Sequence, residues 1–505
     1  MYLLGLDIGS SFIKVSIVDA SNLNCLSNAK YPDQEMKIDS PQPLWAEQHP
    51  DVWWTNTQKA IHAAIVSANI NSSDITAIGI SYQMHGLVCV DKNGTPLRPA
   101  IIWCDSRSIE AGNDLAKNLD ESYIKNHLLN LPGNFTASKL SWLKTHEPDV
   151  YHKIHKIMLP GDYIAYKMTG EFTTTYSGMS EGIFWDFPHH MLSDEVLNAG
   201  GFNKNIFPKI GGCFEIISET NVEFEKSLGI KKGTPISYRS GDQPNNAYSL
   251  GVLNPGEAAF TAGTSGVIYS VSKDVVFDPL SRVNTFAHVN HSEQHHSLGT
   301  LLCINGVGIL YNWLRTNLYQ NTSYDDLEKI AATCDVGSDG LITLPFGNGA
   351  ERMLGNRKIG ASLHNLDFNR HTKAHLIRSG LEGLACAFNY GIEIMKELGI
   401  NIKTVKVGND NLFQSHIFCN TLAAMANIEI EICDVAGATG AARGAANTGS
   451  SQYDPPLSAK AQFIAPLVQT QFIASHLQAQ FIASHIQAQG IAPLYNLWKS
   501  HLQQK

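Results

Sequence analysis

The sequence predicts an α/β protein built from two domains with a cleft between them. With 505 residues the chain exceeds what one hydrophobic core usually supports, and this favours two domains of roughly 200 to 250 residues. Each half opens with two strand-like runs joined by a turn of small residues, at 3–19 and at 251–272. Strands and helices then alternate in both halves, so we predict a duplicated architecture with a boundary near 245–255.

Periodicity places the main elements in both halves. In the first half they are a helix over 50–68, a buried strand over 74–83 and two strand runs about a turn within 86–103. In the second half they are helices near 305–316 and 371–398 and a strand over 404–410. The first helix has apolar residues at helical spacing behind Pro50, which suits a helix start. The turn contains the pair Asn93-Gly94, which favours a hairpin.

The C-terminal segment 451–505 differs in kind from both halves. The motif QFIA recurs at 462–465, 471–474 and 480–483, and QGIA follows at 489–492, so the spacing is nine residues. This spacing rotates successive Phe-Ile pairs to opposite faces of a helix, and no single apolar stripe results. We expect an expanded, loosely packed insert, with an interaction segment as the alternative. The final stretch 491–502 is expected to be able to dock on the body as a helix.

Composition narrows the classes of function. A net charge of −9, with lysines and arginines dispersed along the chain, offers no basic stripe for nucleic-acid phosphates. No apolar run approaches the ~18 to 20 residues of a membrane span, and the first residues lack a signal-peptide pattern. The nine cysteines are scattered without a CxxC pair, which argues against a disulfide framework or a zinc site. We therefore expect a cytoplasmic protein with neither nucleic-acid nor membrane partners.

The stretch LLGLDIGSSFIKVSIVD places a carboxylate beside a small-residue bend. Gly9 is expected to leave backbone N–H groups free, so that the turn, with the hydroxyls of Ser10 and Ser11, can wrap a phosphate. Asp7 would repel such an anion unless a cation stood between them. Mg²⁺, which prefers oxygen ligands, suits that place. A plain hairpin turn with an Asx-type hydrogen bond is the alternative interpretation.

The second half contains a matching bend within FTAGTSGVI. Gly263, Thr264, Ser265 and Gly266 stand between two strand runs. Each half therefore offers a phosphate-binding hairpin, and the two together could clasp a triphosphate.

Asp242, in the stretch SGDQPNNA, follows a glycine at the end of a predicted strand and precedes a predicted helix. Open α/β sheets present ligand-binding residues at this position. A carboxylate there can accept a hydroxyl proton during catalysis. It can also simply cap the helix that begins near Pro244, and the two roles are compatible.

Six stretches, taken in order along the chain, resemble the FGGY family of carbohydrate kinases. They are GLDIGSSFIKVSIVD, SYQMHG, WCDSR, SGDQPNNA, NPGEAAFTAGTSG and LIRSGLEGLACAFNYGIEIM. The resemblance implies the two-domain fold of actin, hexokinase and Hsp70-like ATPases, with duplicated ribonuclease-H-like domains. It implies an N-terminal domain over 1–248 on the sugar side, a C-terminal domain over 249–450 on the nucleotide side, and the tail over 451–505.

The resemblance also implies a reaction, namely transfer of phosphate from ATP to a sugar in the presence of Mg²⁺. Residues 41–54 and 81–94 are most similar to xylulokinases, which implies a ketopentose substrate, D-xylulose, and the product D-xylulose 5-phosphate. Asp242 is implied to be the base for in-line attack, and Asp7 and Asp242 are implied to hold the metal. The family is often dimeric, so a homodimer is one expected assembly.

Several residues are implied to contact the two substrates. The implied sugar-side residues are Gln83, Met84, His85, Trp103, Asp105 and Gln243. The implied nucleotide-side residues are Gly9, Ser10, Ser11, Gly263, Thr264, Ser265, Gly266, Gly408 and Asn411. Gln83 and His85 offer directional hydrogen-bond partners for a polyol. A structural role is the alternative for His85, and core packing or a turn cap is the alternative for Trp103 and Asp105.

Two positions depart from the family pattern. Gln243 stands where many xylulokinases carry Asn, which leaves another pentulose or a polyol such as ribulose or glycerol as the alternative substrate. Gly408 stands alone where the family usually has a run of glycines beside the adenosine, and Asn411 could hydrogen-bond the base there. The helix over 135–144 matches the family in position, and the small residues of 436–446 predict a closely packed helix near the nucleotide end.

Two other classes of function share some of these features. A catalytically weak sugar-binding regulator would fit the altered loop after Gly408 and the repetitive tail. An ATP-dependent conformational protein of the actin or Hsp70 type would share the two hairpins but would lack a sugar pocket. The stretch SYQMHG and Asp242 argue against the latter.

Overall fold

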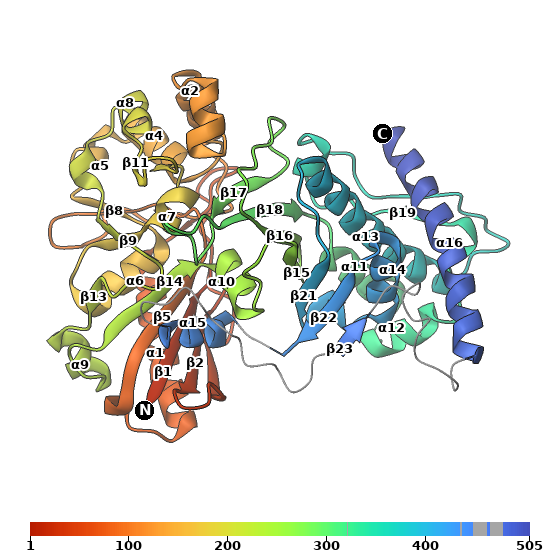
Figure 1. The fold of residues 1–505 in the computed structure, drawn as a ribbon, viewed down its shortest axis with the longest axis horizontal. Coiled ribbons are helices and arrows are strands. Elements are labelled where there is room, and N and C mark those ends of the chain that lie inside the picture. The colour runs from red at the N-terminus through yellow and green to blue at the C-terminus, as the bar shows by residue number, and fades with distance from the viewer. Residues whose placement is uncertain (321, 435–436, 448–461, 465–477) are drawn as a thin grey trace.

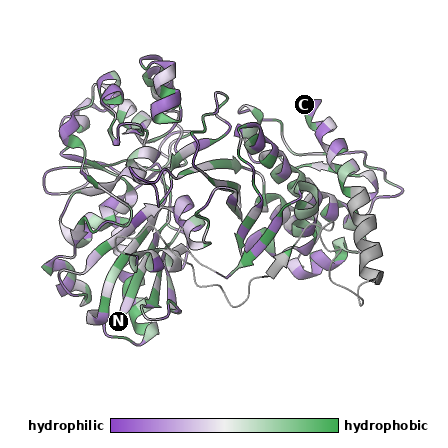
Figure 2. Cartoon of the chain, in the orientation of Figure 1, coloured by the Kyte–Doolittle hydropathy of each residue, from purple (hydrophilic) through white to green (hydrophobic). Residues whose placement is uncertain are grey.

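A computed structural model describes residues 1–320, 322–434, 437–447, 462–464 and 478–505 (Figure 1). The chain forms two lobes, each built around a mixed β-sheet. Figure 2 shows apolar residues along the strands of both sheets, and each sheet contributes to a separate large hydrophobic core. None of the described helices combines the length and the apolar character that crossing a bilayer requires.

The first lobe contains a six-stranded sheet with the order β13-β14-β5-β1-β2-β3. Its strands are β1 (Tyr2–Ile8), β2 (Ile13–Asp19), β3 (Cys25–Tyr31), β5 (Ile75–Tyr82), β13 (Ser218–Glu219) and β14 (Pro235–Gly241). β1 and β2 form an antiparallel hairpin, while β1 and β14 both run parallel to β5. In the register of these pairs Tyr82 lies opposite both Ile8 and Gly241, so three parallel strands end at the same level.

The second lobe contains a seven-stranded sheet with the order β17-β18-β16-β15-β21-β22-β23. Its strands are β15 (Glu257–Ala262), β16 (Gly266–Ser272), β17 (Asn284–Ala287), β18 (Leu298–Ile304), β21 (Thr404–Gly408), β22 (Glu429–Cys433) and β23 (Gln462–Ile464). β15 and β16 form a hairpin, and β21 runs parallel to β15. The hairpin with a parallel neighbour therefore occurs in both lobes, as the two matching sequence patterns predicted.

The first predicted helix shows how local signals set an element. α1 (Pro50–Ala68) begins with proline in its first turn, and the side chain of His49 accepts a hydrogen bond from the Asp51 N–H at 3.3 Å. It ends at Asn69, whose φ of 53° is left-handed. Its apolar stripe, which includes Trp53 and Ile61, is buried against the first sheet. The boundaries agree with those that the sequence predicted.

The remaining helices surround the two sheets and include a helical layer between 109 and 200. In the first lobe they are α2 (Ile109–Lys117), α4 (Thr136–His146), α6 (Pro160–Thr169), α7 (Tyr176–Glu181), α8 (Asp194–Gly200), α9 (Val222–Leu228) and α10 (Asp242–Ser249). In the second lobe they are α11 (Gly308–Leu318), α12 (Tyr324–Ala331), α13 (Lys373–Glu397) and α14 (His416–Ala426). Further short elements include the helices α3 (Glu121–Tyr123) and α5 (Pro148–Tyr151) and the strands β4 (Glu47–Gln48), β6 (Val88–Val90), β7 (Ala100–Ile101), β8 (Lys156–Met158), β9 (Thr173–Thr175), β10 (Trp185–Asp186), β11 (Met191–Leu192), β12 (Lys209–Gly211), β19 (Ile342–Leu344) and β20 (Ser362–His364).

The helix of small residues, α15 (Gly437–Ala445), does not lie in the second lobe. It packs on β1, β5 and β2 of the first sheet, on the face opposite α1 (Figure 1). A Cβ atom at Gly5 would overlap the carbonyl oxygen of Ala438, and one at Gly79 would overlap that of Ala441. The helix is closely packed, as predicted, and it lies on the first sheet although its residues follow the second sheet in the chain. The chain returns to the first sheet after building the second.

Substituting Gly79 by alanine is expected to lower the free energy of unfolding by about 1–3 kcal/mol, because the new methyl group has no room against the α15 backbone. Thermal and urea unfolding would measure this loss. Gly212→Ala is the matched control, since a Cβ there meets only ordinary contacts at 3.4 Å and beyond. Equal stability of the two variants would contradict the close contact between sheet and helix.

The C-terminal stretch does dock on the body as a helix. α16 (Gln478–Gln503) runs along the second lobe and contacts α14, α13 and β19 (Figure 1). Trp498 is fully buried there, and its Nε1–H donates to the carbonyl oxygen of Thr343 at 3.0 Å. Of the QFIA copies, the first contributes β23 and the third lies within α16, whereas the second lies outside the described residues. The expectation of a loosely packed insert falls mainly on that undescribed part.

Candidate active site

Three candidate site segments leave the first sheet together. Because β1, β5 and β14 are parallel and end at one level, the residues that follow them emerge at the same edge. Gly9 follows β1, Gln83 follows β5 and Asp242 follows β14. The N–H of Gln83 donates to the Ile8 carbonyl at 2.9 Å, which holds the first two segments side by side.

Asp7 lies at the carboxyl end of β1, facing the strands on either side. Its carboxylate accepts a hydrogen bond from the Ser81 hydroxyl at 3.3 Å and lies 3.5 Å from the ammonium of Lys14. The lysine is half exposed, so the carboxylate remains partly accessible to a ligand.

Asp242 begins α10 directly after β14. Burial raises the pKa of its carboxyl to about 7, and the negative charge of Asp7 adds to this rise. Hydrogen bonds from Gln243 and the charge of Lys14 act in the opposite direction. Two carboxylates whose charges repel each other this way form a set of oxygen donors that fits a divalent cation such as Mg²⁺.

One other cluster among the described residues has metal-ligating side chains. His127, Asp186 and His189 offer three ligand atoms within 4.8 Å of one another. The Asp186 carboxylate already lies 3.0 to 3.1 Å from both imidazoles and accepts the Tyr123 hydroxyl at 2.6 Å. These hydrogen bonds by themselves explain why the three side chains lie close together.

Gln83 and Met84 lie close to the strand end that carries Asp242. Both atoms of the Gln83 amide are buried and have no hydrogen-bond partner among the described residues. Met84 is buried against Gly241, where a Cβ atom would come within 2.6 Å of its Cγ. The unpaired Gln83 amide is the feature expected of a polar ligand site, because a buried amide otherwise loses hydrogen-bond energy.

His85 is held from several sides in a left-handed backbone conformation, with φ of 61°. Its N–H donates to a carboxyl oxygen of Glu181 at 3.1 Å, and its carbonyl accepts from Lys139 at 2.7 Å. The ring packs against Phe135 and Phe286, with centroids at 4.7 and 5.4 Å, and these two rings also contact each other at 5.7 Å. Burial lowers the pKa of His85 to about 3, and the charge of Lys139 contributes, so the imidazole is neutral.

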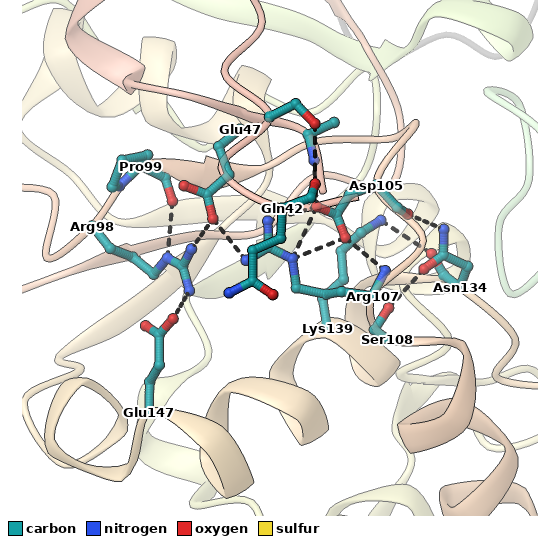
Figure 3. A network of polar contacts seen from close by, with 12 residues as sticks. Gln42, Glu47, Arg98, Pro99, Asp105, Arg107, Ser108, Asn134, Lys139 and Glu147 are labelled. Atoms are coloured by element: carbon teal, nitrogen blue, oxygen red, sulfur yellow. Dashed lines mark hydrogen bonds and ion pairs between the residues drawn. The ribbon is translucent and has the colours of Figure 1, made fainter. Parts of the chain in front are cut away.

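Trp103 and Asp105 lie in different surroundings. Trp103 is 52% exposed, and its Nε1–H donates to the Ser10 hydroxyl at 3.3 Å, so its ring stands beside the first hairpin turn. Asp105 is fully buried, and its carboxylate receives Arg107 and the Ala46 N–H, the latter at 2.6 Å (Figure 3). These contacts match the turn role that the sequence left open for Asp105. Gln243 lies beside Asp242, and its amide oxygen is buried without a partner among the described residues.

The first hairpin turn differs from its expected chemistry in one respect. The Gly9 N–H donates to the Phe12 carbonyl at 3.1 Å and closes the hairpin, so it is not free for a phosphate. The carbonyl of Ser10 accepts from Gln48 at 2.7 Å, and that of Ser11 accepts from the Met36 N–H at 2.9 Å. The turn is thus firmly tied to the segment that precedes α1.

The second hairpin turn borders a groove of about 850 Å³ in the second lobe. The carbonyl of Gly263 accepts from the Gly308 N–H at 2.8 Å, which attaches the turn to the start of α11. The groove is lined by Ala262, Gly263, Thr264, Gly308, Ile309, Tyr311, Asn312, Tyr324, Asp325, Glu328, Lys329, Asn411, Leu412, Gln414, Ser415 and His416. Gly263, Thr264 and Asn411 are therefore brought together as predicted.

Six of the nine predicted nucleotide residues do not line this groove: Gly9, Ser10 and Ser11 of the first hairpin turn, and Ser265, Gly266 and Gly408. Gly266 packs against Phe388 and Val307. The sequence in turn gave no hint of Tyr311, Asn312 or His416, which reach the groove from α11 and α14. It also gave none of Glu181 and Lys139, single residues without a local pattern.

The two lobes, each with a hairpin beside a parallel strand in a mixed sheet, place the chain in the class of proteins with the actin/hexokinase-like ATPase fold. Residues 2–248 match the model of the N-terminal domain of the FGGY family of carbohydrate kinases, and residues 258–452 match its C-terminal domain. The chain therefore belongs to the FGGY family of carbohydrate kinases and is an ATP-dependent sugar kinase.

The chain is similar to several proteins named xylulose kinase. The chain is 28% identical over 404 residues to a xylulose kinase of Staphylococcus epidermidis, covering 80% of this chain and 78% of that one. It is 28% identical over 402 residues to the xylulose kinase of Escherichia coli, covering 80% of each. The crystal structure of a xyloylose kinase from Brucella ovis has a TM-score of 0.82 at 25% identity and covers 99% of this chain and 100% of its own.

A more distant structure shows the same fold. The glycerol kinase of Plasmodium falciparum, solved with ADP, has a TM-score of 0.81 at 18% identity and covers 100% of this chain and 98% of its own. The predicted two-domain fold and the predicted family are thus confirmed.

Proposed function

We propose that this protein transfers the γ-phosphoryl group of ATP to D-xylulose and forms D-xylulose 5-phosphate. The observation that carries the proposal is the common strand edge of the first lobe, where Asp242 emerges beside Gln83 and the segment that holds His85. A candidate base and candidate polyol ligands thus leave adjacent strands at one level. The names of the similar proteins support a ketopentose as the acceptor.

In the proposed reaction Asp242 accepts the proton of the sugar hydroxyl as its oxygen attacks phosphorus. The new O–P bond forms while the bond from phosphorus to the ADP oxygen breaks, and in-line geometry supplies most of the catalysis. Mg²⁺ held by Asp7 and Asp242 would neutralise charge on the phosphates. Without metal, burial and Asp7 raise the pKa of the Asp242 carboxyl to about 7, and bound Mg²⁺ would favour the ionised form that accepts the proton.

Side chains at the same strand edge would form hydrogen bonds with the hydroxyl groups of the sugar. Gln83 offers both a donor and an acceptor, and the neutral His85 offers one further acceptor or donor. A ligand lacking the matching hydroxyl would leave one of these groups unpaired, at a cost of ~1 to 3 kcal/mol. Met84 would form the apolar wall and Gln243 the contact beside the base.

On the nucleotide side, we propose that ATP occupies the groove between the second hairpin and the residues after β21. Gly263 and Thr264 would face the phosphates, and Asn411, whose φ of 52° is left-handed, would lie near the base. Asparagine adopts left-handed backbone conformations more readily than most residues. The loop can therefore follow the course expected for the family although Gly408 is its single glycine.

An ATP-consumption assay across pentuloses and polyols tests the proposal. We expect D-xylulose to give the highest kcat/KM, with D-ribulose, L-ribulose and glycerol turned over less efficiently. Folded protein that consumes no ATP with any sugar would contradict the proposal. Measurable sugar binding without turnover would instead select the sugar-binding regulator.

A further inference from the structure

We infer that Glu181 is a positioning residue of the sugar site, which holds His85 so that its Nε2 atom is the acceptor offered to a sugar hydroxyl. The inference rests on the proposed function for the identity of the ligand. The contacts that carry it concern His85 and the strand end before Asp242.

Glu181 contacts two atoms of His85, the backbone nitrogen and Nδ1. It is the last residue of α7 and only 1% exposed. One carboxyl oxygen accepts the His85 N–H at 3.1 Å, and the backbone carbonyl of Glu181 lies 3.2 Å from the His85 Nδ1. A carbonyl oxygen can only accept, so this contact requires the proton on Nδ1. In a neutral ring Nε2 then carries a lone pair, and it can accept a hydrogen bond from a hydroxyl group.

The backbone of His85 needs this support. A φ of 61° is unusual for a residue with a β-carbon, and such conformations persist only where the surroundings hold them. Lys139 donates to the carbonyl of His85, and the rings of Phe135 and Phe286 pack against its imidazole. The carboxyl of Glu181 is the partner of the remaining backbone group, the N–H.

Glu181 also touches the strand that carries the candidate base. Its second carboxyl oxygen is buried without a hydrogen-bond partner among the described residues. A Cβ atom at Gly241 would lie 2.7 Å from that oxygen, so the absence of a side chain at Gly241 makes room for it. Glu181 therefore lies between His85, the proposed sugar ligand, and Gly241, which precedes Asp242.

The test compares Glu181→Met with Glu181→Gln. Methionine has similar length but lacks the oxygen acceptor, whereas the glutamine amide oxygen can still accept the His85 N–H. We expect Glu181→Met to raise KM for D-xylulose by about 10-fold or more while KM for ATP changes by less than about 2-fold. Glu181→Gln should restore KM for the sugar to within about 3-fold of the wild type.

The matched control is Glu382→Met. Glu382 is also buried and accepts a backbone N–H, that of Gly337 at 2.9 Å, but it lies on α13 of the second lobe. A general loss of stability should appear in both Met variants, whereas the selective rise in the sugar KM should appear only in Glu181→Met. Equal sugar KM values for Glu181→Met and the wild type, or the same rise in the control, would overturn the inference.

A second readout does not depend on turnover. Nitrogen-15 NMR of the wild-type imidazoles, with His85 assigned by His85→Gln, should show His85 protonated at Nδ1 and unprotonated at Nε2. The opposite tautomer would overturn the inference. If the wild type phosphorylates no sugar, the proposed function fails, and the NMR result alone decides whether Glu181 positions His85.

Discussion

Replacing Asp242 by asparagine is expected to lower kcat for phosphoryl transfer by about 10²- to 10⁴-fold, the range of a lost general base. Asparagine keeps the shape of the side chain and its place after β14 but cannot accept the hydroxyl proton. KM for ATP should change less than kcat, since Asp242 is not among the residues lining the nucleotide groove and Asp7 would still hold Mg²⁺. Steady-state kinetics with saturating D-xylulose would measure the loss. Full activity of the variant would show that Asp242 is not the base.

The same substitution is expected to stabilise the fold in a pH-dependent way. The folded pKa of Asp242, about 7, lies above the ordinary value of 3.8, so ionisation costs more in the folded state. The stability contributed by the protonated carboxyl is complete below about pH 4 and is lost as pH rises through 7. Asparagine avoids this loss, so the gain in Tm over the wild type should be larger at pH 8 than at pH 5.

Thermal unfolding without divalent cations would measure the gain, because a bound metal would favour the ionised carboxylate. Asp114→Asn is the control, since Asp114 is exposed and pairs with Lys117 on the same helix. An equal gain in Tm at both pH values would contradict a pKa of Asp242 that is raised by burial and by the charge of Asp7.

Truncating Trp498 to alanine is expected to cost about 3–5 kcal/mol of stability, as the loss of a fully buried indole usually does. The change opens a cavity among Phe346, Tyr390 and Tyr495 and leaves the Thr343 carbonyl without its donor. Urea unfolding would measure the loss, and limited proteolysis should cleave before the terminal helix sooner than in the wild type.

Leu497→Ala provides the matched control on the same helix. Leu497 is 37% exposed, so its truncation removes little buried area, and only a small change in stability is expected. Similar stability of the two variants would mean that α16 does not depend on Trp498 for docking on the second lobe.

Local sequence signals predicted much of this fold because they act between near neighbours. The proline start and apolar spacing of α1 gave both of its boundaries, and the two small-residue turns gave the hairpins β1–β2 and β15–β16. The terminal helix was expected from its apolar residues at 491–502. In each case residues within one or two turns of each other decide the element.

The candidate site likewise contains residues that local sequence patterns predicted and residues that only the tertiary structure revealed. Asp7 and Asp242 stand beside glycines at strand ends, a pattern visible in the sequence, and the parallel register then brings their segments to one edge. Glu181 and Lys139 had no such pattern, because their contacts with His85 join residues that are far apart in the chain. The raised pKa of Asp242 likewise depends on burial and on Asp7 across the sheet.

By itself the sequence determined that this protein is a two-lobed α/β carbohydrate kinase, with its hairpins, its acidic residues and their order. The tertiary structure alone decided that α15 returns to the first sheet, that the Gly9 amide is used within its hairpin, and that Glu181 grips His85. The physical reason is the range of the interactions. Turn and helix propensities depend on neighbouring residues, whereas backbone contact between Gly79 and Ala441 exists only once distant segments have packed together.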